Sequence, residues 1–524
     1  MLSLCPESRQ VQLQRATLDL LALVFLAACL SASAVVFFYP LEIETRESTV
    51  WLHVLALRQG VNLYDHTQVA FINTNHGPFD PLFKLLIVTL FPFLEAWQVA
   101  RFSVFILPYA FLLVAWRLLF KESRRSFLEV AYLGSIGYLF LIVSAKEFLF
   151  VGRSDATAAV LLLILTSLVI LKAPKRSWSW LLHGFTCGSV GILLMLTNWR
   201  MLPVVFALFI FSLWMFRYQG QATLRDLALY SSSYLCACAA IFGLLLYHSF
   251  GLDLSLYYSH FFGVYAKASG HGHRTYGHAP AIFFLGSLIK PAARPDSLKG
   301  GPVLLALAVY LLVPGKASVQ NRAWFVLGAF VFAACTVAYY LNYYGGGAWY
   351  YIPFLIVLWF FLCSNYQMMS SSRLAAVGAA IIVLVCVNVR TVVTPTLWRA
   401  ATLSPAYDFM SRLRALEKTN SILSEDTFFF RTAYQGELID MGDMVSSVRK
   451  RGYYGDDFNR TVDNHFERIR KRLPDYIVTG FTESPELRKV INEDYVLVAE
   501  GPGNFTANGR GESRLFKRKN MNIP

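Results

Sequence analysis

The chain has 524 residues, of which 56% are hydrophobic and 15% charged, and its mean hydropathy is +0.47. Soluble domains carry roughly 25% charged residues, so a soluble protein of this composition could not cover its own surface. The same figures exclude intrinsic disorder, a collagen-like fibre and a small disulfide scaffold, and they indicate a polytopic membrane protein.

The formal net charge of +14 could suggest a nucleic-acid partner. The basic residues, however, lie in short gaps between apolar runs, which is the distribution that orients helices in a bilayer. The pattern therefore predicts membrane lipids as the surroundings of this charge, and no nucleic acid.

The first apolar run, at about residues 17–39, is long enough to span a membrane and has no clear cleavage site. Arg9 and Arg15 precede it and favour an inside N-terminus. We expect a retained anchor that leaves the membrane on the outer side.

A long mixed segment, residues 40–98, follows outside. Its short apolar run, 82–94, is expected to lie on the outer membrane surface, because a further span here would move the basic cluster at 121–125 outside. Further upstream, an amphipathic helix from about 50 to 57 is expected to rest its apolar face on the bilayer.

The remaining apolar runs alternate between the two sides, with a second long outer loop at 249–300. Together with the first span they predict about eleven transmembrane helices. The later spans are placed at about 99–119, 127–145, 156–171, 180–197, 201–216, 227–248, 301–314, 323–341, 348–363 and 374–390.

The tail changes character, with ordinary charge density and alternating apolar runs at 420–426 and 474–480 separated by amphipathic stretches. Strands alternating with helices predict a small α/β domain. The predicted organisation is a transmembrane domain at 1–394 and an extracytoplasmic α/β domain at 395–524.

Charged residues gather in the first outer loop, where Glu44, Arg46 and Glu47 precede the amphipathic helix. Gly60 follows about thirteen residues after Glu47, then a Leu-Tyr pair, and later His76-Gly-Pro before the apolar surface run. Capping and solvation explain any one acid equally well, because helix N-termini favour carboxylates. The order of the features is more specific than any one of them.

That order resembles the first extracytoplasmic loop of the GT-C glycosyltransferases. The similarity is greatest to the family 39-like branch that holds protein O-mannosyltransferases and lipid A aminoarabinose transferases, and it covers the whole layout of loops, spans and tail. The resemblance implies a GT-C-like fold. It also implies transfer of a sugar from a polyprenyl-phosphate carrier to a lipid, glycan or protein acceptor on the outer face.

By position in this resemblance, Glu47 is the catalytic carboxylate. Arg46 stands where the family often has the first acid of a pair, which leaves Glu44 as a competitor for the role. His76 stands where a lysine is common, and there a cation would face the carrier phosphate.

Two further groups mark the outer ends of spans. Arg153 and Asp155 are either an ion pair with a capping acid or, as in similar positions of the family, part of the active cavity. Arg200 lies where topology does not favour positive charge. It either reaches lipid headgroups or binds phosphate through its planar fork.

The second outer loop contains Lys267 among several histidines, which suggests either a metal site or cations that close on the donor phosphate. Tyr350 and Tyr351 follow three glycines at a late span, where an aromatic belt or a wall for the lipid carrier would explain them.

The sequence thus predicts an inverting transferase with Glu47 as general base. Asp155 either orients the acceptor or shares the role of base, and Arg153, Arg200 and His76 stabilise the leaving phosphate. The sequence identifies no cofactor, and a divalent metal is left open. A bacterial inner membrane is expected, since no retention signal or tail disulfide is present. The alternatives are a transporter or flippase of a lipid-linked substrate, and a non-catalytic scaffold.

Overall fold

The computed structural model describes the chain in segments, and every structural statement below concerns these residues. They are 9–40, 43, 47–63, 77–120, 127–149, 152–170, 174, 176–218, 222–250, 319–342, 352–365, 378–379, 403–424, 429–435, 455–479, 485–506 and 509–519.

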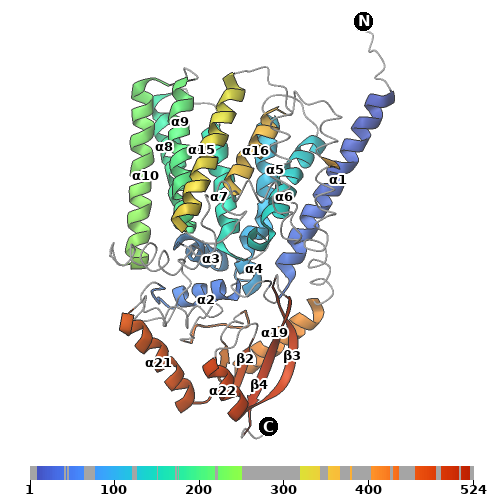
Figure 1. Cartoon of the computed structure of the whole chain (residues 1–524), viewed down its shortest axis with the longest axis vertical. Helices are drawn as coiled ribbons and strands as arrows, with labels where there is room; N and C mark the ends of the chain where they lie inside the picture. The colour runs from blue at the N-terminus through green and yellow to red at the C-terminus, as the bar shows by residue number, and fades with distance from the viewer. Residues whose placement is uncertain are drawn as a thin grey trace.

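A bundle of apolar helices makes up the body of the protein (Figure 1). Its members are α1 (Arg9–Phe38), α5 (Phe102–Phe120), α6 (Phe127–Leu149), α7 (Ser154–Ile170), α8 (Ser177–Thr197), α9 (Leu202–Tyr218), α10 (Leu224–Phe250), α15 (Val319–Asn342) and α16 (Ile352–Asn365). Four segments are long and apolar enough to cross a membrane, and five shorter apolar helices stand beside them. Each of these nine helical segments coincides with a predicted span. The predicted spans 301–314 and 374–390 lie outside the described residues, apart from positions 378–379.

Close helix packing in the bundle depends on glycine. Gly184 and Gly188 of α8 lie one turn apart against the backbone of α10, where a Cβ on either would overlap the carbonyl oxygen of Tyr230 or Tyr234. Small residues four apart let two helix backbones approach closely, which is how helices associate without a hydrophobic driving force.

Three short helices lie across one end of the bundle, away from the N-terminus (Figure 1): α2 (Glu47–Arg58), α3 (Phe79–Leu90) and α4 (Ala96–Ala100). We call them the cap. The apolar run predicted to lie on the membrane surface is α3, which does not run through the bundle. The expectation for α2 was wrong: every residue from Glu47 to Ala56 is buried by protein, so its apolar face does not rest on the bilayer.

The C-terminal part of the chain forms a four-stranded sheet with helices. Its elements are α19 (Leu403–Glu417), β1 (Ile422–Ser424), α21 (Gly455–Lys471), β2 (Tyr476–Thr479), α22 (Pro485–Asp494), β3 (Tyr495–Thr506) and β4 (Gly509–Arg518). The strand order is β1-β2-β4-β3, with β1 and β2 parallel and the other pairs antiparallel. The two strands predicted from alternation are β1 and β2.

This C-terminal part packs directly on the cap. The indole Nε1 of Trp51 in α2 donates a hydrogen bond of 2.9 Å to the carbonyl oxygen of Arg431. Arg414 of α19 pairs with Glu95 at 2.5 Å and lies 5.4 Å from the ring of Trp97. The cap is thus held between the bundle and the C-terminal sheet, which explains the burial of α2.

Replacing Gly188 by Ala should separate α8 from α10 and lower the free energy of unfolding by about 1–3 kcal/mol, the usual effect of overpacking. Thermal unfolding of the purified protein in detergent measures the change. Gly243→Ala is the matched control, because a Cβ at that position of α10 meets nothing within 4 Å. If Gly188→Ala and Gly243→Ala unfolded at the same temperature, close contact between α8 and α10 at Gly188 would be contradicted.

Candidate functional site

Glu47, the first residue of α2, is completely buried and paired with an arginine. Its Oε1 accepts from Arg101 Nε at 2.6 Å and its Oε2 from Arg101 Nη2 at 2.7 Å. The backbone nitrogens of Ile43 and Gly152 donate to the same carboxylate at 2.6 and 2.7 Å. A carboxylate has about four acceptor positions, so these four donors occupy it fully.

Arg101 itself joins the ends of several elements. Its Nη1 donates to the carbonyl oxygens of Val36 and Tyr39 at the end of α1, groups that a helix terminus leaves without internal partners. The rings of Tyr39 and Phe429 lie 5.8 and 5.5 Å from its guanidinium carbon. One side chain therefore connects α1, α2 and the C-terminal part.

A second buried ion pair lies on α3. Lys84 Nζ is 2.8 Å from Asp80 Oδ2, and both side chains are buried. The other oxygen, Oδ1, accepts the hydroxyl of Thr157 at 2.6 Å. The Ser103 and Thr157 hydroxyls are 2.6 Å apart, and Ser103 is the donor because Thr157 has already given its single proton to Asp80.

The two ion pairs meet on the backbone of one residue, Gly152. Its nitrogen donates to Glu47, and its carbonyl oxygen accepts from Lys84 Nζ at 2.9 Å. A Cβ here would lie 2.9 Å from the carbonyl oxygen of Ala100, so the close approach requires glycine. This clamp fixes the backbone immediately before α7.

The residues that follow the clamp are the predicted pair. Arg153 and Asp155 are both nearly buried, with Arg153 Nε 3.4 Å from Asp155 Oδ2. Asn198 Nδ2 donates to Asp155 Oδ1 at 3.4 Å. Within the described part of the chain no group donates a hydrogen bond to Oδ2. Asp155 therefore keeps acceptor capacity that Glu47 lacks.

The end of α8 brings the remaining predicted cation to this place. Asn198 caps the short 3₁₀ helix η1 (Trp199–Met201), with its Oδ1 accepting from the Arg200 nitrogen at 3.3 Å. The Gly77 nitrogen donates to the Thr197 carbonyl at 3.0 Å, so the segment that leads into α3 reaches the same turn. Arg200 is buried in the protein, unlike a side chain that extends to lipid headgroups.

His53 lies on α2, near these charges. Burial, with a smaller contribution from the charge of Lys84, lowers the pKa of His53 to about 3. The imidazole is consequently neutral at physiological pH.

Four predicted site residues are thus described, and Arg153, Asp155 and Arg200 gather around Asn198, with Glu47 on the other side of Gly152. Glu47 itself is fully enclosed and fully hydrogen-bonded, and its role as general base stays a prediction. The other candidates lie outside the described residues: Glu44, Arg46, His76, Lys267, Tyr350 and Tyr351.

Sequence reasoning missed Asp80, Lys84, Arg101 and Asn198. Two signals were available. Asp80 and Lys84 have the (i, i+4) spacing of a helical ion pair. Arg101 stands at the predicted outer end of the predicted span 99–119, where positive charge is disfavoured, and this is the same signal that singled out Arg200.

A metal was left open by the sequence. Among the described residues no group of three His, Cys, Asp or Glu side chains could hold an ion. The carboxylates of Glu47 and Asp80 are already engaged by Arg101 and Lys84, so the described side chains do not by themselves make a metal site.

The overall fold is similar to that of a solved structure. The similar structure is that of ArnT from Cupriavidus metallidurans bound to undecaprenyl phosphate. It has a TM-score of 0.55 and 12% identity, and the match covers 96% of this chain and 99% of that one.

Two further matches have lower scores and carry no argument. They are apo ArnT from the same organism (TM-score 0.35, 12% identity, covering 94% of this chain and 97% of that one) and an Archaeoglobus fulgidus oligosaccharyltransferase in complex with Zn and sulfate (TM-score 0.39, 11% identity, 88% and 68%). No family model and no curated protein sequence matches the chain.

Glu47→Gln should lower the free energy of unfolding by about 3–5 kcal/mol, because it leaves the Arg101 charge buried without a counter-ion. Thermal or chemical unfolding in detergent measures the loss. Glu467→Gln removes the same charge from an exposed pair with Lys471 and should change stability by less than about 1 kcal/mol. A Glu47→Gln protein as stable as this control would show that the pair does not hold the cap.

His53 should make stability depend on pH. Because its folded-state pKa of about 3 lies below the ordinary 6.5, the unfolded chain binds more protons between these values. The contribution of neutral His53 to the unfolding free energy is complete above about pH 6.5. Acidification through this window should lower the unfolding free energy by about 1.4 kcal/mol per pH unit, and His53→Gln should flatten the profile. Parallel unfolding profiles of wild type and variant from pH 7 to 4.5 would refute this contribution.

Proposed function

We propose that the protein is a membrane glycosyltransferase that moves a sugar from a polyprenyl-phosphate carrier to a lipid, glycan or protein acceptor at the outer membrane face. The shared fold supports this, since ArnT was solved with undecaprenyl phosphate bound. So does a group of buried charged residues at the cap end of the bundle, with arginines suited to phosphate beside a carboxylate.

Asp155 is the general base in this proposal. The observation that carries the assignment is its Oδ2, a buried carboxylate oxygen to which no described group donates a hydrogen bond. A base needs a lone pair within reach of the acceptor proton. Asp155 has that capacity, whereas the lone pairs of Glu47 are taken by Arg101 and two backbone nitrogens.

The transfer then proceeds by inversion. The acceptor oxygen or nitrogen attacks the anomeric carbon while the bond from that carbon to the phosphate oxygen breaks. The acceptor proton passes to Asp155, and the polyprenyl phosphate leaves with its electron pair. Arg153 and Arg200 supply positive charge where the phosphate becomes more negative.

Glu47 acts here as a positioning residue. Through Gly152 it fixes the start of α7, and thereby the place of Asp155, the second residue of that helix. Roles that the resemblance gave to other residues remain part of the proposal: Glu44 as an alternative acid, Arg46, His76 and Lys267 toward phosphate, and Tyr350 and Tyr351 along the lipid carrier.

The same proposal includes the topology. The basic residues that follow the far ends of the helices, such as Arg217 at the end of α9 and Arg225 at the start of α10, gather at the end that carries the N-terminus. By the positive-inside rule that end is cytoplasmic, which puts the cap and residues 395–524 outside. We propose eleven spans in all, in a bacterial inner membrane.

Asp155→Asn should lower turnover by about 10²–10⁴-fold, the usual contribution of a general base, while the unfolding midpoint stays near that of wild type. The measurement is sugar transfer from a panel of radiolabelled polyprenyl-phosphate sugars by purified protein supplied with envelope lipid and protein acceptors. Asp463→Asn, the same substitution at an exposed position of α21, is the matched control and should turn over as wild type does. Near-normal turnover of Asp155→Asn would refute the base assignment, and a wild type that consumes no donor of the panel would refute the proposed function.

A further inference from the structure

A groove separates α5 and α7 at the end of the bundle opposite the cap. Its volume is about 610 Å³, within the roughly 300–1,000 Å³ of small-ligand sites. Both helices begin at the cap end, and the groove lies along their last two turns. It is lined by Leu113, Val114, Trp116, Arg117, Ile164, Ser167 and Leu168.

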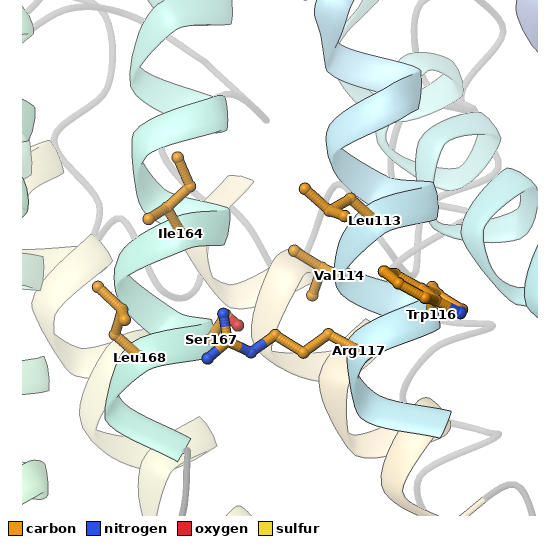
Figure 2. A pocket seen from close by; sticks show the side chains of 7 residues that line it. All are labelled: Leu113, Val114, Trp116, Arg117, Ile164, Ser167 and Leu168. Carbon is orange, nitrogen blue, oxygen red and sulfur yellow. The ribbon is translucent and has the colours of Figure 1, made fainter. Parts of the chain in front are cut away.

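The groove has one charged group at an otherwise apolar wall. Figure 2 shows the guanidinium of Arg117 extending from α5 across to Ser167 on α7, with Leu113 and Ile164 facing each other one to two turns further into the bundle. No carboxylate of the described residues pairs with Arg117. A lone cation with a hydroxyl beside it calls for an anionic oxygen ligand.

The apolar part of the groove is open to the surroundings of the bundle. Leu113 is 61% and Trp116 50% exposed. At this depth in a spanning helix the surrounding medium is the acyl-chain region, and Trp and Arg near a helix end favour the headgroup boundary. The surface therefore combines an acyl-chain channel with a phosphate-binding end.

We propose that this groove binds an anionic glycerophospholipid of the leaflet on the N-terminal side. Its phosphate contacts Arg117 and the Ser167 hydroxyl, and one acyl chain lies between Leu113 and Ile164. An anionic headgroup is favoured over a zwitterionic one, because none of the described lining residues is a carboxylate that could receive an ammonium. The site lies at the end of the bundle opposite Asp155, so the inference does not rest on the proposed glycosyl transfer.

Native mass spectrometry of the detergent-purified protein tests the proposal, with phosphatidylglycerol and phosphatidylcholine of identical acyl chains added in turn. Wild type should retain phosphatidylglycerol in preference to phosphatidylcholine. Arg117→Gln should retain at least about tenfold less phosphatidylglycerol, since a charge-assisted hydrogen bond contributes about 1.5–3 kcal/mol. Arg217→Gln, an exposed arginine in the last turn of α9 at the same end, is the matched control and should bind as wild type does.

A second variant keeps the test decisive if Arg117→Gln fails to fold. Ile164→Trp fills the acyl-chain channel and leaves the cation, and it should also release the lipid. Equal retention of both lipids by wild type, equal loss in Arg117→Gln and Arg217→Gln, or full retention by Ile164→Trp would each overturn the proposal.

Discussion

Two buried ion pairs hold one glycine, and the position of the candidate site depends on that arrangement. Glu47 accepts a hydrogen bond from the nitrogen of Gly152, and Lys84 donates one to the carbonyl oxygen of the same residue. A buried ion pair adds little net stability compared with an apolar pair, because its attraction mostly offsets the cost of removing two charges from water. Their contribution here is geometric. Together the two pairs fix the position of α2 and α3 relative to the start of α7.

The placement of buried charge also separates the functional classes. A transporter of lipid-linked substrates is expected to have charged groups and broken helices near the middle of the membrane. In the described bundle the buried charged side chains of Glu47, Arg101, Asp80, Lys84 and Asp155 all belong to the cap or to the helix ends beside it. These buried charges therefore lie where the bundle meets the cap and not in the middle of its helices.

Much of this architecture follows from the sequence, because apolar runs and basic gaps report helix position independently of tertiary contacts. The helices from α5 to α10 and the strands β1 and β2 were predicted for that reason. Burial was harder to predict. Glu47 was found by its place at the start of α2, but nothing local shows that Arg101, 54 residues away, pairs with it. The hydrogen bond between Trp51 and Arg431 joins residues 380 positions apart. Such contacts with the C-terminal part bury α2, which the sequence alone places on a surface.

That covering bears on the chemistry of the site. The guanidinium of Arg101 lies near two rings, that of Tyr39 and that of Phe429. Since Phe429 belongs to the C-terminal part, that part helps to shield the Glu47–Arg101 pair from water. Hydrogen bonds between charged groups strengthen as the local dielectric falls, and the clamp on Gly152 is therefore stiffer with the C-terminal sheet in place than it would be at a wet surface. The C-terminal part contributes no predicted catalytic side chain among its described residues. Its contribution is a dry environment in which the two carboxylates on either side of Gly152, the proposed positioning residue Glu47 and the proposed base Asp155, retain different hydrogen-bonding states.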